Sequence, residues 1–233
     1  MNIGTGAVRL LVLVSTLLLL GGFSGSVSAG RFCEPFLHGK VKQSVLDAVL
    51  DAAKAGDLYR IQPATSSVKF CIDSVFDHVE GNLTDFEGGV AMKLGAEEGG
   101  QALLSINVDS VSTSNRLVDK LVKSRTFIDV KNYPEILFVS SGFKWLKGTA
   151  GVVRGDLTLH GVTRPVIFDV ELTDVKGRRI GRGSNILIKI TSDIKRSDFG
   201  MRKMRPLVKD TVKLCISARA TKANLSCLEC HGS

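Results

Sequence analysis

GVVRGDLTLHGVTRPVIFDVEL, residues 151–172, consists of two strand-like segments on either side of a short turn. Apolar side chains recur at nearly every second position of 151–159 and 166–172, which is the period of a β-strand with one buried face. Gly161 allows a positive φ angle in the turn, and Pro165 fixes the re-entry of the chain. The stretch therefore predicts two strands joined tightly at His160, whose alternative role is contact with a ligand head group or a metal.

Strand signals extend outward from this stretch in both directions. They occupy residues 58–61, 68–72, 79–92, 103–109, 136–140, 143–146, 180–190 and 211–218. Gly, Pro or charged residues separate the segments, as expected for turns. Eight or nine short strands in a row predict an antiparallel sandwich or a closed barrel.

Two segments have helical spacing instead. Between Gln43 and Ala55 apolar residues recur at intervals of three and four, and the pattern stops at Gly56. Between Asn115 and Ser124 the same spacing interrupts the strands. We therefore expect one helix before the sheet and a short helix inserted into it.

The first 29 residues have the organisation of a signal peptide. Arg9 is followed by an apolar run over 10–20 and by small residues that end at Ala29. We predict cleavage after Ala29 and export to the periplasm, with an uncleaved anchor as the alternative. About 204 residues then remain, enough for one domain with a sizeable core.

The charge of the chain gives little indication of a partner. The net charge of +8 becomes +7 without the signal peptide, which contains one Arg and no acid. Basic residues are scattered among acidic ones, with short clusters at 195–196 and 202–205. We expect a solvated surface and no nucleic-acid partner.

The segment 227–231, Cys-Leu-Glu-Cys-His, is the attachment signature of a c-type haem. In this arrangement Cys227 and Cys230 bind the porphyrin vinyl groups while His231 binds the iron. A disulfide or half of a zinc site is the alternative. For the second axial ligand of the iron we favour His38, followed by His78, Met201 and Met204. Three cysteines lie outside the motif: Cys33, Cys71 and Cys215.

Three motifs resemble, in order and spacing, those of the YceI-like polyisoprenoid-binding proteins. They are the segments 157–166, 127–130 with Tyr133-Pro134, and 196–201, and the similarity extends over roughly 58–219. The resemblance implies a mainly β fold, a lipocalin-like antiparallel barrel of eight strands that encloses an isoprenoid tail. Together with the patterns described above, it divides the chain into four regions: a signal peptide (1–29), an N-terminal helical extension (30–56), a lipid-binding barrel (57–220) and a C-terminal tail with the haem motif (221–233), of which only the barrel belongs to the family domain.

In such a barrel we expect one group of side chains to contact the lipid: Phe70, Phe127, Phe138, Phe168, Arg196, Phe199 and Met201. The basic loop after Arg196 would hold an anionic or polar head group, unless it is an ordinary loop with internal ion pairs. Cys71 and Cys215 would lie on neighbouring strands, as a disulfide at the seam of the barrel or as buried free thiols. At two positions that carry other residues in the family, this chain has Ser74 and Val118-Asp119.

These features together predict a periplasmic binding protein that holds an isoprenoid lipid or quinone and carries a covalent haem c. It would act as an electron carrier toward the quinone or toward a redox partner protein in or at the membrane. A haem-free lipid carrier or stress protein with a terminal disulfide, and a small enzyme with an open haem site, are the alternatives. No motif for hydrolysis or phosphoryl transfer occurs, so we expect no such activity, and a dimer is one option for the oligomeric state.

Overall fold

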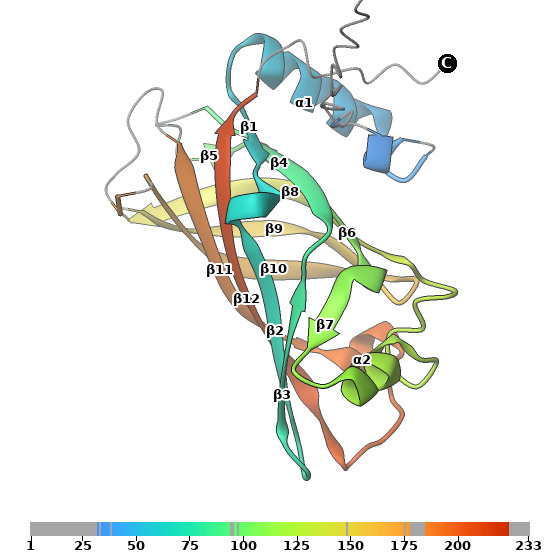
Figure 1. The fold of residues 1–233 in the computed structure, drawn as a ribbon. Coiled ribbons are helices and arrows are strands. Elements are labelled where there is room, and N and C mark those ends of the chain that lie inside the picture. The colour runs from blue at the N-terminus through green and yellow to red at the C-terminus, as the bar shows by residue number, and fades with distance from the viewer. Residues whose placement is uncertain are drawn as a thin grey trace, which may run out of the picture.

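The computed structural model describes residues 32, 34–37, 39–93, 96, 98–147, 149–174, 176–177 and 185–223 (Figure 1). The two α-helices in this part of the chain are α1 (Gln43–Lys54) and α2 (Arg116–Lys123). The strands are β1 (Leu58–Ile61), β2 (Ser67–Ser74), β3 (His78–Leu83), β4 (Phe86–Ala91), β5 (Glu98–Gly99), β6 (Gln101–Asn107), β7 (Val111–Thr113), β8 (Glu135–Lys147), β9 (Ala150–Leu159), β10 (Val162–Asp174), β11 (Ile186–Lys195) and β12 (Val208–Lys222). Within these residues no helix is long and apolar enough to span a membrane.

The strands form a closed antiparallel barrel. Its ring runs β1-β4-β6-β8-β9-β10-β11-β12 and closes where β12 pairs again with β1. Each neighbouring pair in the ring is antiparallel. The structure therefore confirms the expected eight-stranded barrel, together with its leading helix and its inserted helix.

The barrel is closed at one end and opens at the other. Beyond the ring, β12 pairs with β2, β2 with β3, and β3 with β7. β8 pairs with β6 but, in the described structure, not with β7, so a gap remains in the wall there. The helix α2 contacts β7 beside this gap. In Figure 1, α2 and the β2–β3 hairpin lie at the end opposite to α1.

The turn between β9 and β10 has the predicted form. Leu159 is paired with Val162, which leaves only two residues in the loop, and both have positive φ angles: 53° at His160 and 71° at Gly161. Two successive positive φ angles define the type I′ turn that matches the twist of a hairpin. The ring of Tyr133 packs where a Cβ of Gly161 would lie, only 2.4 Å away, so a larger residue does not fit.

The N-terminal extension packs on the outer wall of the barrel. Phe32, Phe36 and α1 form a second apolar cluster with the outward-facing side chains of β1, β4, β6 and β8. Phe32 is 1% exposed and lies over Gly89, where a Cβ would be 2.8 Å from its ring. Burial of this apolar surface fixes the extension to the barrel.

Several predicted boundaries differ from the observed ones, among them the run expected at 79–92, which is two strands, β3 and β4. The two expected strands at 136–140 and 143–146 are one strand, β8, with a register shift between Ser140 and Gly142 that keeps both halves in the sheet. The strand expected at 180–190 is observed as Ile186–Lys195, and 178–184 lie outside the described residues. β12 continues past Ala220 to Lys222 because β1 pairs with its last residues.

Candidate functional site

The open end of the barrel contains an apolar cavity of about 280 Å³. Its walls come from β2, β3, α2, the segment that follows α2, β12, the loop before β12 and the ends of β8, β9 and β11. The apolar residues that line it are Phe70, Ile72, Phe76, Val79, Leu83, Val118, Leu121, Val122, Phe127, Ile128, Ile136, Leu159, Ile194, Met201, Met204, Val208, Val212 and Leu214. Small-molecule sites are usually about 300–1,000 Å³, so a long-chain ligand needs this cavity to widen.

The alternation of β2 explains why its apolar side chains reach the cavity. Phe70 and Ile72 point inward, while Cys71 and Asp73 lie on the opposite face of the strand. Phe70 lies across β3 at Gly81, where a Cβ would be 2.3 Å from its ring. Gly81 therefore makes room for the ring, which forms part of the cavity wall.

The structure brings four of the seven predicted lipid contacts to this cavity and places three elsewhere. Phe70, Phe127, Arg196 and Met201 line it. Phe138 and Phe168 pack against each other in the barrel core with their ring centroids 5.4 Å apart, away from the cavity lining. Phe199 is buried in the same core and accepts a hydrogen bond at its carbonyl from His160 Nδ1 at 3.1 Å, when that nitrogen carries the proton. The sequence predicted that these rings point into the barrel. It did not predict how far along the barrel axis the packed core extends.

Arg196 acts as an internal clamp. It is 1% exposed, and burial lowers the pKa of its guanidinium. Nε donates to Lys209 O, Nη1 donates to Met201 O and Lys203 O, and Nη2 donates to Val208 O, at 2.6–3.0 Å. The ring of Phe127 lies 5.6 Å from its central carbon. Four of its five N–H groups are therefore used to hold the backbone of the loop, so this side chain fixes the loop as well as lining the cavity.

A polar hollow adjoins the apolar cavity. Phe127 and Met201 border both spaces, and the hollow is further lined by Arg125, Thr126, Asp129, Asn132, Tyr133, His160, Gly200, Arg202 and Lys203. The ring of His160 packs against Tyr133 with 4.5 Å between the ring centroids. Three basic side chains and one acidic side chain at this place favour an anionic or polar group.

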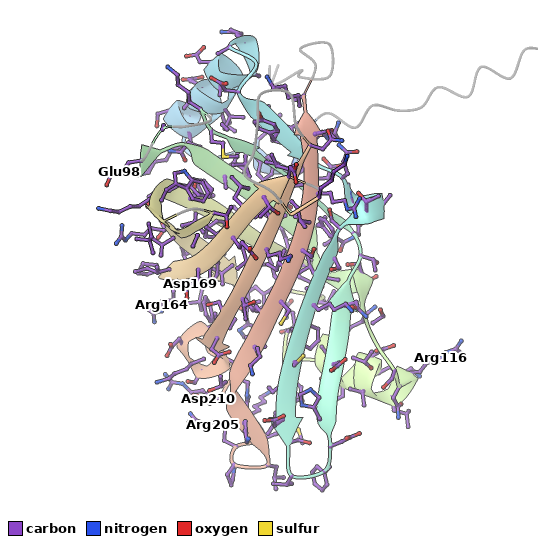
Figure 2. All side chains as sticks on the ribbon, turned by 90° about the vertical axis from the view of Figure 1, so that its left-hand side faces the viewer. Glu98, Arg116, Arg164, Asp169, Arg205 and Asp210 are labelled. Atoms are coloured by element: carbon purple, nitrogen blue, oxygen red, sulfur yellow. The ribbon has the colours of Figure 1, made fainter. Side chains whose placement is uncertain are left out.

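Exposed apolar side chains surround the mouth of the cavity. Val75 and Phe76 at the tip of the β2–β3 hairpin are 67% and 76% exposed, Leu117 on α2 is 73% exposed, and Leu207 before β12 is 42% exposed. The adjacent segments 116–125 and 201–210 together contain eight basic and two acidic residues. Figure 2 shows Arg116 projecting from α2 and Arg205 near the same end of the molecule. We call this apolar and basic surface the mouth rim. In the sequence, the mouth rim was indicated by two adjacent apolar residues, Val75 and Phe76, between two predicted strands.

The two described cysteines lie on the outside of the barrel, half-buried and unpaired. Cys71 is opposite Lys213 and Cys215 is opposite Lys69, so the thiols are two residues out of register. The prediction that β2 and β12 are neighbours is correct. The structure has free thiols in place of the disulfide, and they are half-buried, not buried, because both face outward and lie two residues out of register.

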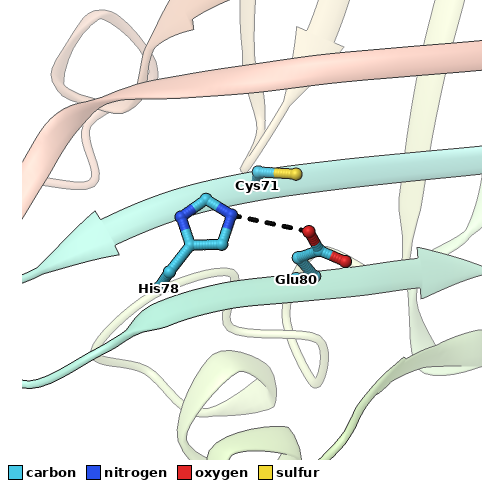
Figure 3. A group of neighbouring side chains, drawn as sticks. All are labelled: Cys71, His78 and Glu80. Atoms are coloured by element: carbon cyan, nitrogen blue, oxygen red, sulfur yellow. Dashed lines mark ion pairs between the residues drawn. The ribbon is translucent and has the colours of Figure 1, made fainter.

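A polar cluster surrounds Cys71 on this outer face (Figure 3). Atoms of Cys71, His78 and Glu80 that could ligate a metal lie within 4.8 Å of one another. His78 Nδ1 is 2.6 Å from Asp73 Oδ1, and Lys209 Nζ is 2.9 Å from Asp73 Oδ2. The hydrogen bond from Lys209, followed by that from His78, lowers the pKa of Asp73 to about 2, and Asp73 in turn raises the pKa of His78.

The predicted haem ligands Cys227, Cys230, His231 and His38 lie outside the described residues, as does Cys33. The described chain ends at Ala223, whose N–H donates to Leu58 O at the closed end of the barrel. Ala223 and Leu37, the residue before His38, both pack against the apolar cluster around α1. The two segments that carry the predicted ligands thus begin close to the same cluster.

Comparison with known proteins gives a family match and several structural relatives. Residues 59–220 match the model of the YceI-like domain. A UPF0312 protein of Pseudomonas putida strain W619 is 31% identical over 147 residues, which is 63% of this chain and 76% of that protein. The crystal structure of Burkholderia cenocepacia BcnA matches 69% of this chain and 99% of its own, with 24% identity and a TM-score of 0.62.

A second solved structure shares the fold at lower identity. It is a polyisoprenoid binding domain from Saccharophagus degradans, implicated in plant cell wall breakdown, with 16% identity and a TM-score of 0.54. The match covers 71% of this chain and 98% of that domain. The family match runs from Tyr59 in the first strand of the ring to Ala220 in the last, whereas the N-terminal extension and the tail lie outside it.

Proposed function

This chain belongs to the YceI-like domain family, and from that membership and its cavity we propose that the barrel binds the apolar tail of an isoprenoid lipid, such as a quinone or a polyprenyl lipid. The observation that carries the proposal is the almost entirely apolar lining of the cavity at the open end of the barrel. Such a lining stabilises a hydrocarbon chain by removing it from water. The polar hollow beside it would take the head group.

The helix α2 would serve as the movable wall that adapts the cavity to a longer tail. It has eight residues, and none of them is fully buried. Val118, Leu121 and Val122 are its contacts with the cavity. An element with so few buried contacts opens at a low free-energy cost, whereas the hydrogen-bonded ring of strands stays closed.

We further propose that the mouth rim rests on an anionic membrane while the lipid enters or leaves. A lipid tail is too insoluble to cross water freely, so the exposed Val75, Phe76 and Leu117 beside the cavity would enter the interface. The basic residues of 116–125 and 201–210 would pair with anionic head groups. Binding to vesicles that contain anionic lipid should then weaken as salt is raised, and it should weaken also in Phe76→Asp.

Native mass spectrometry of the full chain purified from an exporting host tests the lipid proposal. We expect a co-purified isoprenoid in the wild type and its loss in Leu214→Trp, which fills the cavity. Lys213→Trp is the matched control, because Lys213 is on the same strand but exposed on the other face. Equal lipid in both variants, at equal thermal stability, would contradict the proposal.

We propose that the C-terminal tail binds a covalent haem, so that the protein carries electrons in the periplasm, with a redox partner protein in or at the membrane. The sequence Cys227-Leu228-Glu229-Cys230-His231 and the export signal support this. A peroxidase-stained gel and an absorbance spectrum, recorded after expression with the haem-attachment machinery, provide the test. Absence of covalent haem would favour the haem-free carrier with a terminal disulfide.

The second axial ligand is constrained by the length of the barrel. Lys209 and His78 both bond to Asp73, so they mark the same end of the barrel. The chain advances fourteen residues along β12 from Lys209 to Ala223, a distance of about 45 Å at about 3.3 Å per residue. The eight residues from Ala223 to His231 reach at most about 28 Å. This reach disfavours His78, Met201 and Met204 and leaves His38. We expect His38→Ala to change a low-spin haem spectrum and to open the ferrous iron to carbon monoxide, and His78→Ala to leave the spectrum unchanged.

A further inference from the structure

The outer face of the β2–β3 hairpin groups a thiol, an imidazole and two carboxylates that the lipid site does not use. Cys71 is directly opposite Glu80, and Asp73 is directly opposite His78. All four side chains therefore project from the same face of two paired strands, away from the cavity. Figure 3 shows the imidazole of His78 directed toward Glu80 on the same strand, with Cys71 near both on the neighbouring strand.

The separations of the three ligand atoms suit a small metal ion. His78 Nε2 is 3.6 Å from Glu80 Oε1, and the Cys71 thiol lies within 4.8 Å of both groups. Bonds of about 2.0–2.3 Å in a tetrahedral zinc site place ligand atoms roughly 3.3–3.8 Å apart. A small rotation of the Cys71 or Glu80 side chain would complete this geometry, and the exposed face leaves space for a water as fourth ligand.

The fourth side chain already orients the imidazole. Asp73 Oδ1 lies 2.6 Å from His78 Nδ1, so this carboxylate holds the proton on Nδ1 and leaves the lone pair of Nε2 toward Cys71 and Glu80. Metal-bound histidines almost always have such a carboxylate or carbonyl partner on the other nitrogen. Lys209 Nζ holds the second oxygen of Asp73 at 2.9 Å, which fixes the carboxylate in place.

We propose that Cys71, His78 and Glu80 bind a zinc ion, with Asp73 as the positioning residue of His78. Sulfur, nitrogen and oxygen ligands together favour zinc over calcium and magnesium, which prefer oxygen ligands. Binding displaces one proton from the Cys71 thiol to solvent, and the dication balances the resulting thiolate and the Glu80 carboxylate. The competing interpretation is an ion pair between His78 and its two acids without any metal.

The position of this site gives it a consequence for the cavity mouth. β7 pairs with Gly81–Leu83, so the segment of β3 from His78 to Glu80 pairs, in the described structure, with β2 alone. A zinc ion would cross-link the two strands at this edge. The tip of the same hairpin carries Phe76, which borders the cavity mouth. Zinc would therefore stiffen one side of the mouth independently of the lipid bound there.

Titration of the full-length chain with Zn²⁺, measured by calorimetry, tests the site. The background carries Cys227→Ser and Cys230→Ser, because the terminal motif could itself bind zinc. Co²⁺ serves as the spectroscopic probe, since thiolate ligation in a tetrahedral site gives a charge-transfer band. We expect one ion per chain and a thermal stabilisation by Zn²⁺. Cys71→Ser and His78→Ala should abolish binding, and Asp73→Asn should weaken it about 10–100-fold.

Two variants serve as matched controls. Cys215→Ser removes the other outward-facing thiol of the same surface, and Glu98→Gln removes an exposed carboxylate that pairs with Lys144 elsewhere. Both should bind zinc as the parent does. Absence of zinc binding by the parent, or equal binding by Cys71→Ser and Cys215→Ser, would overturn the proposal, whichever lipid the barrel contains.

Discussion

Replacement of Arg196 by Met tests the role of this residue as the clamp of the cavity loop. Met retains an apolar side chain of similar length but removes every donor. The backbone carbonyls of Met201, Lys203, Val208 and Lys209 would then lose the guanidinium that binds them. Removal of a buried charge alone would be favourable, but orphaned buried carbonyls oppose this gain because nothing replaces their donor.

The structure allows the size of this effect to be worked out. The bonds to Met201 O and Val208 O are buried, whereas those to Lys203 O and Lys209 O are partly exposed and can be replaced by water. Each buried carbonyl without a partner costs about 1–3 kcal/mol. We therefore expect Arg196→Met to lower the free energy of unfolding by about 2–6 kcal/mol, a large fraction of the 5–15 kcal/mol typical of a domain.

Urea unfolding followed by circular dichroism measures this change. Arg164→Met is the matched control, because Arg164 is exposed and makes one hydrogen bond to the same loop, from Nε to Asp198 O at 3.2 Å. We expect the control to change the free energy of unfolding by no more than about 0.5 kcal/mol. A loss below about 1 kcal/mol for Arg196→Met would refute the reasoning and would show that water replaces the guanidinium at all four carbonyls.

Three further predictions follow from other contacts. In Gly81→Ala the new Cβ would be 2.3 Å from the present position of the Phe70 ring and should push this ring into the cavity. Bound lipid measured by native mass spectrometry should therefore fall, at a stability cost of about 1–3 kcal/mol, and unchanged lipid would contradict this. The hydrogen bond from the Thr113 hydroxyl lowers the pKa of Asp119 from 3.8, so its contribution to stability is present above pH 4 and is lost as the pH falls through the lowered value; urea midpoints should therefore drop less steeply below pH 4 in Asp119→Asn than in the wild type. Phe32→Ala should release the N-terminal extension, which limited proteolysis should then cut before the barrel; equal resistance in mutant and wild type would argue against the packing role of this ring.

Features that depend on local sequence were predictable. The two-residue period of 151–159 and the positive φ at Gly161 specify a hairpin without reference to the rest of the chain. The helical spacing of 43–55 and the Asn115 cap, whose side chain accepts from Leu117 N, likewise mark α1 and α2. Alternation also indicates which side chains point inward, since that depends on the strand alone.

Features that depend on distant partners were not predictable. Phe138 and Phe70 both point into the barrel, but only the packing of the opposite wall decides that one meets Phe168 and the other lines the cavity. The role of Arg196 required knowledge of where the next thirteen residues return, because its acceptors are backbone carbonyls. Cys71 and Cys215 are offset by two residues in the pairing of β2 with β12. A β-bulge near the start of β12 helps to set this register, and the composition of the strands does not encode it.

β12 runs the full length of the barrel, from Val208 at the mouth to Lys222 beside the outer wall that α1 covers. The strand thus separates the cavity mouth from the α1 end of the barrel by about 45 Å. When the mouth faces a bilayer, Ala223 lies at the pole away from that bilayer, where its N–H donates to Leu58 O. The lipid exchange that we propose at the mouth would consequently leave the α1 end of the barrel free of contact with the membrane.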